Sequence, residues 1–192
     1  MRGAPGTGRS GIALAAAALV LLAGARAAGA PASGPLDVGH LFFAGDLGVG
    51  QLRRSGGGFD DDQARFYMAG SGGFAVSSRV LLGLEIGGWL VEAGDIDDPG
   101  RGAGVAKLFV TGRVYPFRMS GFHVRAGAGA VNAWENAPDG IDAWGAGWEA
   151  GIGYDVSLTY SQHITPFLVY SRGSAGAVRV RAVTLGVGYT WR

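Results

Sequence analysis

Seven charged side chains recur inside otherwise apolar segments, and they are the residues of this chain best suited to chemistry. Each alternates with apolar neighbours, so an extended strand would direct all of them to the same face. Buried charges of both signs must pair, because an unpaired buried ion is costly. The pattern therefore predicts a buried salt-bridge network in which Glu85 and Glu149 meet Arg113 and Arg125. The complete set is Asp46, Glu85, Lys107, Arg113, Arg125, Glu149 and Asp155.

Other catalytic and metal-binding chemistries have weaker support. The three histidines, His40, His123 and His163, show no His-x-x-x-His spacing, and the absence of cysteine excludes thiolate metal sites and disulfides. Two acidic runs, 60–62 and 95–98, lack the full spacing of a calcium loop and are interpreted as solvated loops. No serine stands beside His123 as a nucleophile would have to. The sequence predicts no catalytic residue, no cofactor and no metal.

The segments that carry the charges have two contrasting faces. In 144–156, Trp, Ala, Ile, Tyr and Val alternate with Gly, Glu and Asp, and in 183–192 Val, Leu, Tyr and Trp alternate with Thr and Gly. This period of two predicts strands, and Gly, Asp, Pro and Ser separate one strand from the next. Eight strands are expected, at about 40–52, 64–76, 80–91, 105–117, 122–133, 144–156, 163–171 and a last one that reaches residue 192.

The number and length of these strands suit a barrel in a membrane. A tilted strand crosses a bilayer with about 9–11 residues. The segments after odd strands are long and often acidic, whereas those after even strands are mostly short, as in barrels with short periplasmic turns. The predicted fold is an all-β, eight-stranded antiparallel transmembrane up-and-down barrel over residues 38–192. Eight strands leave a lumen just wide enough to be filled by side chains.

A soluble barrel with the faces reversed is the alternative. Against it, the chain has a single lysine, too few charges for a solvated exterior. Large aromatic residues also lie on the apolar face near strand ends, as an interfacial girdle requires. The girdle is predicted to comprise Trp144, Trp148, Tyr154, Tyr189 and Trp191.

The first 30 residues have the composition of a secretory signal peptide. Arg2 and Arg9 precede a short apolar run, 12–23, which small residues follow. That run is short for an uncleaved membrane anchor, which needs about 20 residues. Residues 31–37 form a short leader. Without residues 1–30 the chain has 13 basic and 15 acidic residues, a net charge of −2, so its charge does not favour binding to nucleic acid.

Three runs carry a resemblance to a known group. They are 108–116 (LFVTGRVYP), 151–154 (GIGY) and 186–191 (GVGYTW). Together with the strand count, they resemble the OmpA/OmpX-like eight-stranded outer-membrane barrels of Gram-negative bacteria. The resemblance implies a place in outer-membrane lipid and recognition by the barrel assembly machinery, with Tyr189 and Trp191 as the assembly signal.

The fold leaves three functions open. The leading interpretation is a structural or surface-interaction role, with a side-chain-filled lumen and outer loops that could meet an extracellular ligand. The first alternative is a narrow pore or carrier for small or apolar solutes. The second is a lipid-modifying enzyme, which the sequence disfavours because it marks no nucleophile.

Overall fold

A computed structural model of the chain describes residues 38–57, 59–92, 102–117, 120–135, 140 and 142–192. The expected signal peptide (1–30) and leader (31–37) lie outside the described residues. So do the acidic run 95–98 and most of the segment 136–141. Among the residues described, no helix is long and apolar enough to cross a membrane.

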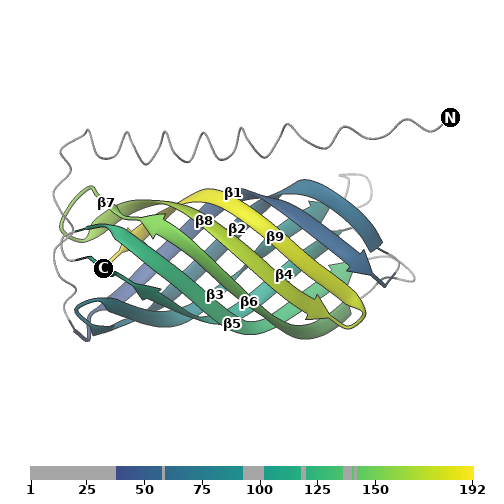
Figure 1. The fold of residues 1–192 in the computed structure, drawn as a ribbon, viewed down its shortest axis with the longest axis horizontal. Coiled ribbons are helices and arrows are strands. Elements are labelled where there is room, and N and C mark those ends of the chain that lie inside the picture. The colour runs from purple at the N-terminus through teal and green to yellow at the C-terminus, as the bar shows by residue number, and fades with distance from the viewer. Residues whose placement is uncertain (1–37, 58, 93–101, 118–119, 136–139, 141) are drawn as a thin grey trace.

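The described chain forms one closed antiparallel sheet (Figure 1). Each long strand pairs with the next, β1 pairs with β9, and β6 pairs with β8, so the wall has no free edge. The two-residue β7 adds a short pairing to β8. The predicted eight-stranded barrel is confirmed. Its strands are β1 (Leu41–Gly56), β2 (Phe59–Ser77), β3 (Val80–Glu92), β4 (Ala103–Val114), β5 (Phe122–Glu135), β6 (Asp142–Tyr154), β8 (Gln162–Ala175) and β9 (Val178–Trp191), with β7 at Val156–Ser157.

Two segments expected as loops are mostly strand. The polar run 53–62 continues the β1–β2 ladder up to a turn at Gly56 and Gly57, both of which have positive φ. Arg54 lies opposite Asp61 in this ladder and pairs with it at 2.9 Å, which stabilises the extension without apolar contacts. Likewise β8 runs on to Ala175, and the chain turns at Gly176. The polar residues of these segments belong to the parts of the strands that project beyond the apolar belt.

Pro166 lies where the pairing of β8 is interrupted. The ladder to β6 ends at Phe167, and pairing on the same side resumes only at Ile164, which faces β7. Proline has no N–H to donate to a sheet, so a central strand tolerates it at such a break. Pro166 therefore lies within β8 at a position where the ladder on one side is interrupted.

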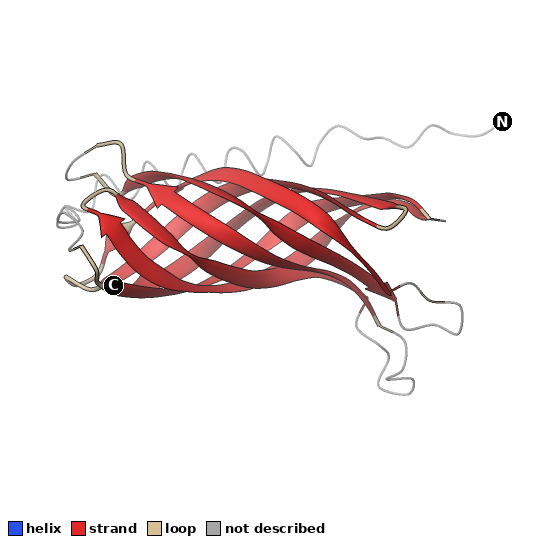
Figure 2. Cartoon of the chain, turned by 90° about the horizontal axis from the view of Figure 1, so that it is seen from below, coloured by secondary structure: helices blue, strands red, loops and turns tan. Residues whose placement is uncertain are grey.

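The two faces of the wall are those that the alternation predicts. Along β3, Leu84 and Ile86 are 58% and 67% exposed, whereas Glu85 between them is 1% exposed. Figure 2 shows the tilted strands of the wall. The same contrast of exposed apolar and buried polar or small residues continues around them. A continuous apolar exterior is unfavourable in water, and this rules out the soluble alternative.

Side chains fill the lumen in three zones. Toward the β1–β2 and β8–β9 turns, the filling is aliphatic and includes Leu52, Val105, Val131 and Val180. Toward the opposite end, a small apolar cluster joins Phe42, Ala75, Leu81 and Tyr115. Most of the predicted charges lie between these clusters.

Candidate functional site

Arg125 is the centre of the charged cluster. From β5, its Nη1 lies 2.9 Å from Asp46 Oδ2 of β1. Its Nη2 lies 2.8 Å from Glu149 Oε1 of β6 and also pairs with Glu85 of β3. All four side chains are at most 5% exposed. One guanidinium therefore joins four strands across the lumen.

Lys107 completes the cluster. Its Nζ lies 2.7 Å from Glu85 Oε1 and also pairs with Glu149. Aromatic faces surround the ammonium group, an arrangement that stabilises a desolvated cation. The ring centroids lie 5.1 Å (Tyr67), 5.7 Å (Trp89) and 5.4 Å (Phe109) from Nζ.

Arg113 does not join the glutamates, and that part of the prediction is wrong. Its guanidinium donates to Thr190 Oγ1 at 3.2 Å and to Ser71 Oγ at 3.4 Å. The reason is register: Arg113 of β4 lies directly opposite Arg125 of β5. Arg125 reaches the carboxylates, and like charges repel, so Arg113 turns toward hydroxyl groups.

Asp155 belongs to a second polar cluster at the end of the barrel where β4 and β6 stop. Tyr115 Oη donates to Asp155 Oδ2 at 2.8 Å, Arg192 Nη1 lies 3.2 Å from the same oxygen, and Thr165 donates to Oδ1 at 2.8 Å. Burial by itself raises the pKa of Asp155, but its interactions with His123 and Arg192 outweigh burial and lower that pKa. The carboxylate is therefore held ionised.

Ser157 and His163 form a serine–histidine pair that the sequence did not reveal. Ser157 Oγ lies 3.1 Å from His163 Nδ1, and Arg192 Nε lies 3.0 Å from His163 Nε2. Arginine carries only donors, so Nε2 must accept and the proton resides on Nδ1. That proton points at Ser157, whereas a general base must offer the hydroxyl a lone pair. The pair is arranged to hold structure, not to activate a nucleophile.

The predicted girdle residues are outward-facing but do not all lie near strand ends. Trp144 is 65% exposed near one end of β6, while Tyr189 and Trp191 are about half exposed near the end of β9. Tyr154 is half-buried at the other end of β6. Trp148 lies at the middle of β6, where it is paired in register with Arg172. The assembly role of Tyr189 and Trp191 stays a prediction.

The acidic run 60–62 lies in β2 and already has partners. Asp61 pairs with Arg54, and Asp62 accepts a hydrogen bond from Gln51. Within the described ranges, no group of three or more His, Asp or Glu side chains is placed so that it could hold a metal ion.

The hydroxyl-bearing residues of the two clusters were not predicted from the sequence. Tyr67 donates to Glu85, and Tyr115 and Thr165 donate to Asp155. Strand alternation already placed Tyr67 and Tyr115 on the inner face, so the face was available from sequence although the partners were not. The same alternation extended past Thr190 directs Arg192 inward.

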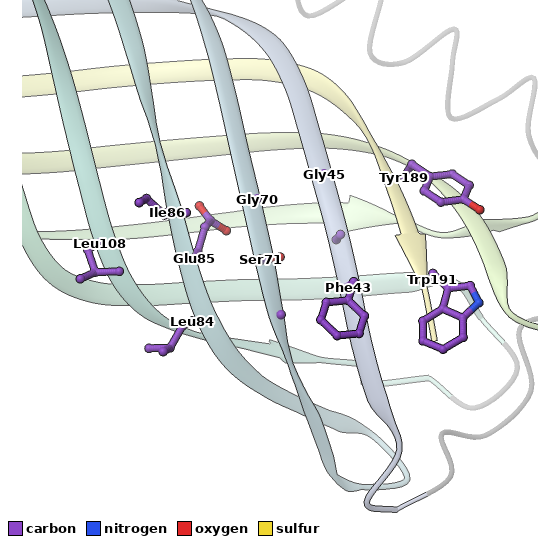
Figure 3. A pocket seen from close by; sticks show the side chains of 12 residues that line it. Phe43, Gly45, Gly70, Ser71, Leu84, Glu85, Ile86, Leu108, Tyr189 and Trp191 are labelled. Atoms are coloured by element: carbon purple, nitrogen blue, oxygen red, sulfur yellow. The ribbon is translucent and has the colours of Figure 1, made fainter.

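The lipid-facing wall has an open trough, with a volume of about 600 Å³. Figure 3 shows Gly45 and Gly70 at its floor, between Leu84 and Ile86 on one side and Trp191 on the other. The two glycines lack side chains on the outward face, and no atom lies within 4 Å of a Cβ built at either position. The trough is apolar and open to the membrane.

A closed antiparallel wall with an apolar exterior and a paired, charged interior defines a membrane-spanning β-barrel. No protein-family model and no curated protein matches the sequence. Solved structures do match. Neisserial surface protein A is 13% identical to this chain, with a TM-score of 0.57 over 79% of this chain and 96% of that protein.

Ail, the attachment invasion locus protein of Yersinia pestis, is also 13% identical, with a TM-score of 0.55 over 81% of this chain and 100% of Ail. A further Ail structure, in complex with the heparin analogue sucrose octasulfate, gives a TM-score of 0.52 at 13% identity over 79% and 99% of the two chains. At this identity the likeness establishes the fold. The chain has the fold of the small OmpA/OmpX-like outer-membrane β-barrels of Gram-negative bacteria.

Proposed function

We propose that this barrel is a closed scaffold in the outer membrane, with a structural or surface-interaction role carried at its outer end. The observation that carries the proposal is Arg125, which pairs across the lumen with carboxylates from β1, β3 and β6. Buried apolar side chains fill the lumen between these charges and the β1–β2 and β8–β9 turns. Ions that entered would have to displace a paired, desolvated network.

Conductance tests the closed lumen. The full chain, refolded into planar bilayers, is expected to leave them silent at voltages that open general porins. A heat-dependent shift in gel mobility of the same sample serves as the control for folding. Stable openings from folded protein would contradict the scaffold and support the narrow pore or carrier.

The outer end is proposed to be the one with the β1–β2 and β8–β9 turns. In support, the β1–β2 hairpin projects as a rigid, ion-paired ribbon, whereas the β2–β3 connection at the other end is a tight turn. An epitope tag inserted after Gly57 should therefore be stained on intact cells. The same tag inserted after Ser78 should be stained only after permeabilisation, and the reverse pattern would invert the orientation.

A surface ligand is the finer part of this proposal. The Ail structure with sucrose octasulfate makes sulfated polysaccharide a first compound to test on intact cells that express this chain. Heparin-bead capture above that of cells with empty vector would support the role. Equal capture would remove heparin as a candidate.

A lipid-modifying activity has no supporting geometry in the described residues. Ser157 Oγ accepts a hydrogen bond from His163 Nδ1, so His163 offers the hydroxyl no lone pair and the pair lacks a base. Lipid A extracted from cells that express the chain is therefore expected to be unchanged in mass spectra. A modification that disappears in Ser157→Ala would overturn this assignment.

A further inference from the structure

Four arginines face outward at one boundary of the apolar belt. On β9 the outward face changes from Val183 to Arg181, and on β8 it changes from Tyr170 to Arg172. Each arginine is exposed, and the switch occurs toward the β8–β9 turn. The complete set is Arg53, Arg172, Arg179 and Arg181.

Three of these arginines stand in one row. Arg181 lies directly opposite Arg172 on one side and directly opposite Arg53 on the other. Like charges placed opposite each other across strands repel and destabilise a sheet. Within the described part of the chain, the side chains of Arg172, Arg179 and Arg181 make no ion pair or hydrogen bond, in contrast to those of Arg54 and Arg125. An anion from outside the chain would remove this repulsion.

A groove on the wall accompanies the arginines. It has a volume of about 430 Å³ and lies over β5, β6, β8 and β9. Its floor is apolar, because outward positions of β5 and β6 there carry alanine beside Trp148. Its lining includes Ala128, Ala146, Trp148, Arg172, Arg179 and Arg181. Basic and apolar surfaces therefore meet in one concavity.

We propose that this groove binds a phosphorylated lipid of the surrounding leaflet, with phosphate on Arg172, Arg179 and Arg181 and an acyl chain along Ala128, Ala146 and Trp148. Guanidinium groups bind phosphate in a bidentate manner, and the belt boundary is the depth at which lipid phosphates lie. A soluble anion would use the arginines but not the apolar floor. The inference rests on the proposed membrane placement of the barrel.

Native mass spectrometry of the folded chain in detergent tests the proposal. Bis-phosphorylated lipid A and the same lipid after dephosphorylation are the two probes. The phosphorylated lipid should bind in a one-to-one complex and more tightly than the dephosphorylated one. Arg172→Gln/Arg181→Gln should weaken that binding about 25-fold, roughly fivefold for each arginine near an anionic surface. Equal binding of both probes, or of wild type and variant, overturns the inference.

A second pair of variants tests the apolar floor while it keeps every arginine. Ala146→Phe fills the groove, whereas Ala150→Phe adds the same bulk one outward position along β6, outside it. Only the first should weaken binding. Equal effects would overturn the groove as the acyl site. Inositol hexakisphosphate, which has no acyl chain, should bind more weakly than the lipid, and equal affinity would reassign the arginines to soluble anions.

The outcome separates this inference from the proposed function. The gel-mobility shift on heating reports folding of every sample. A wild-type chain that shows no shift in membranes contradicts the membrane barrel itself. A wild-type chain that folds but does not distinguish the two lipids contradicts only the lipid site.

Discussion

The lumen and the lipid-facing wall use arginine and glycine under opposite constraints. Inside, Arg125 is 3% exposed and contacts three carboxylates. Outside, Arg172 and Arg181 face each other with no acid between them in the described structure. The desolvated charge needs its partners within the chain, whereas the exposed charge can obtain them from the surroundings.

The glycines of the lumenal and outer faces also differ in their surroundings. A Cβ at Gly186 would lie 2.5 Å from Cζ of Phe167, which fills the lumen beside Arg125. At Gly70, on the outer face, a Cβ would meet nothing within 4 Å. Lumenal glycine therefore makes room for large side chains, and glycine on the wall leaves a trough that lipid can fill.

The largest effect is expected from arginine substitution inside the barrel. Arg125→Leu leaves Glu85 and Glu149 with Lys107 alone and removes the ion-pair partner of Asp46. Loss of one partner from a buried ion cluster costs about 3–5 kcal/mol. Urea unfolding in lipid vesicles, followed by tryptophan fluorescence, measures it. The matched variant Arg172→Leu should change stability by less than about 0.5 kcal/mol, as exposed positions do. Equal losses of stability in the two variants would contradict the difference between lumenal and lipid-facing arginines.

Alanine substitutions at an inner and an outer glycine should differ less in stability than the two arginine substitutions do. Gly186→Ala forces a methyl group against Phe167 and the backbone of β1, and such overpacking costs about 1–3 kcal/mol. Gly70→Ala should be within about 0.5 kcal/mol of wild type, because its Cβ enters open space. The same unfolding assay measures both variants. A loss of stability in Gly70→Ala would show that the trough has no room for the added methyl group.

Asp155 adds a pH dependence at the end of the lumen. Its pKa is lowered, so its stabilisation is fully present above the unfolded pKa of about 3.9 and is lost as pH falls through the lower folded pKa. Asp155→Asn should cost about 1–3 kcal/mol at pH 7, through hydrogen bonds left unsatisfied. The difference from wild type should shrink below about pH 4. A difference that is constant with pH would contradict the ionised carboxylate.

The smallest effect is expected in the arginine row. In vesicles of neutral phosphatidylcholine, Arg181→Gln should stabilise the barrel by about 0.2–1 kcal/mol, because it relieves repulsion by Arg172 and Arg53. In vesicles that contain bis-phosphorylated lipid A the gain should disappear. Arg79→Gln, an exposed arginine in the β2–β3 turn, is the control and should respond to neither lipid. The same gain in both vesicles would mean that the row has no lipid partner.

Much of the fold could be predicted because one local rule governs it. Alternation placed Leu84 outside and Glu85 inside, and it distinguished the two faces of most other strands, although both faces of 163–171 are fairly apolar. The strand boundaries were less predictable. The run 53–62 reads as a loop by composition, but cross-strand ion pairing extends the strands through it. The Ser157–His163 pair was missed because the turn at 158–161 pairs β7 with β8 and brings the two residues opposite each other.

The sequence by itself determined the class of barrel and the side of the wall on which each of the seven predicted charges lies, because a period of two fixes which side each residue takes. Only the tertiary structure decided which charges meet. Asp46, Glu85 and Glu149 come from strands that are not neighbours of one another, and their heights in the lumen depend on the stagger with which the sheet closes. That stagger places Arg125 among the carboxylates and Arg113 among hydroxyl groups.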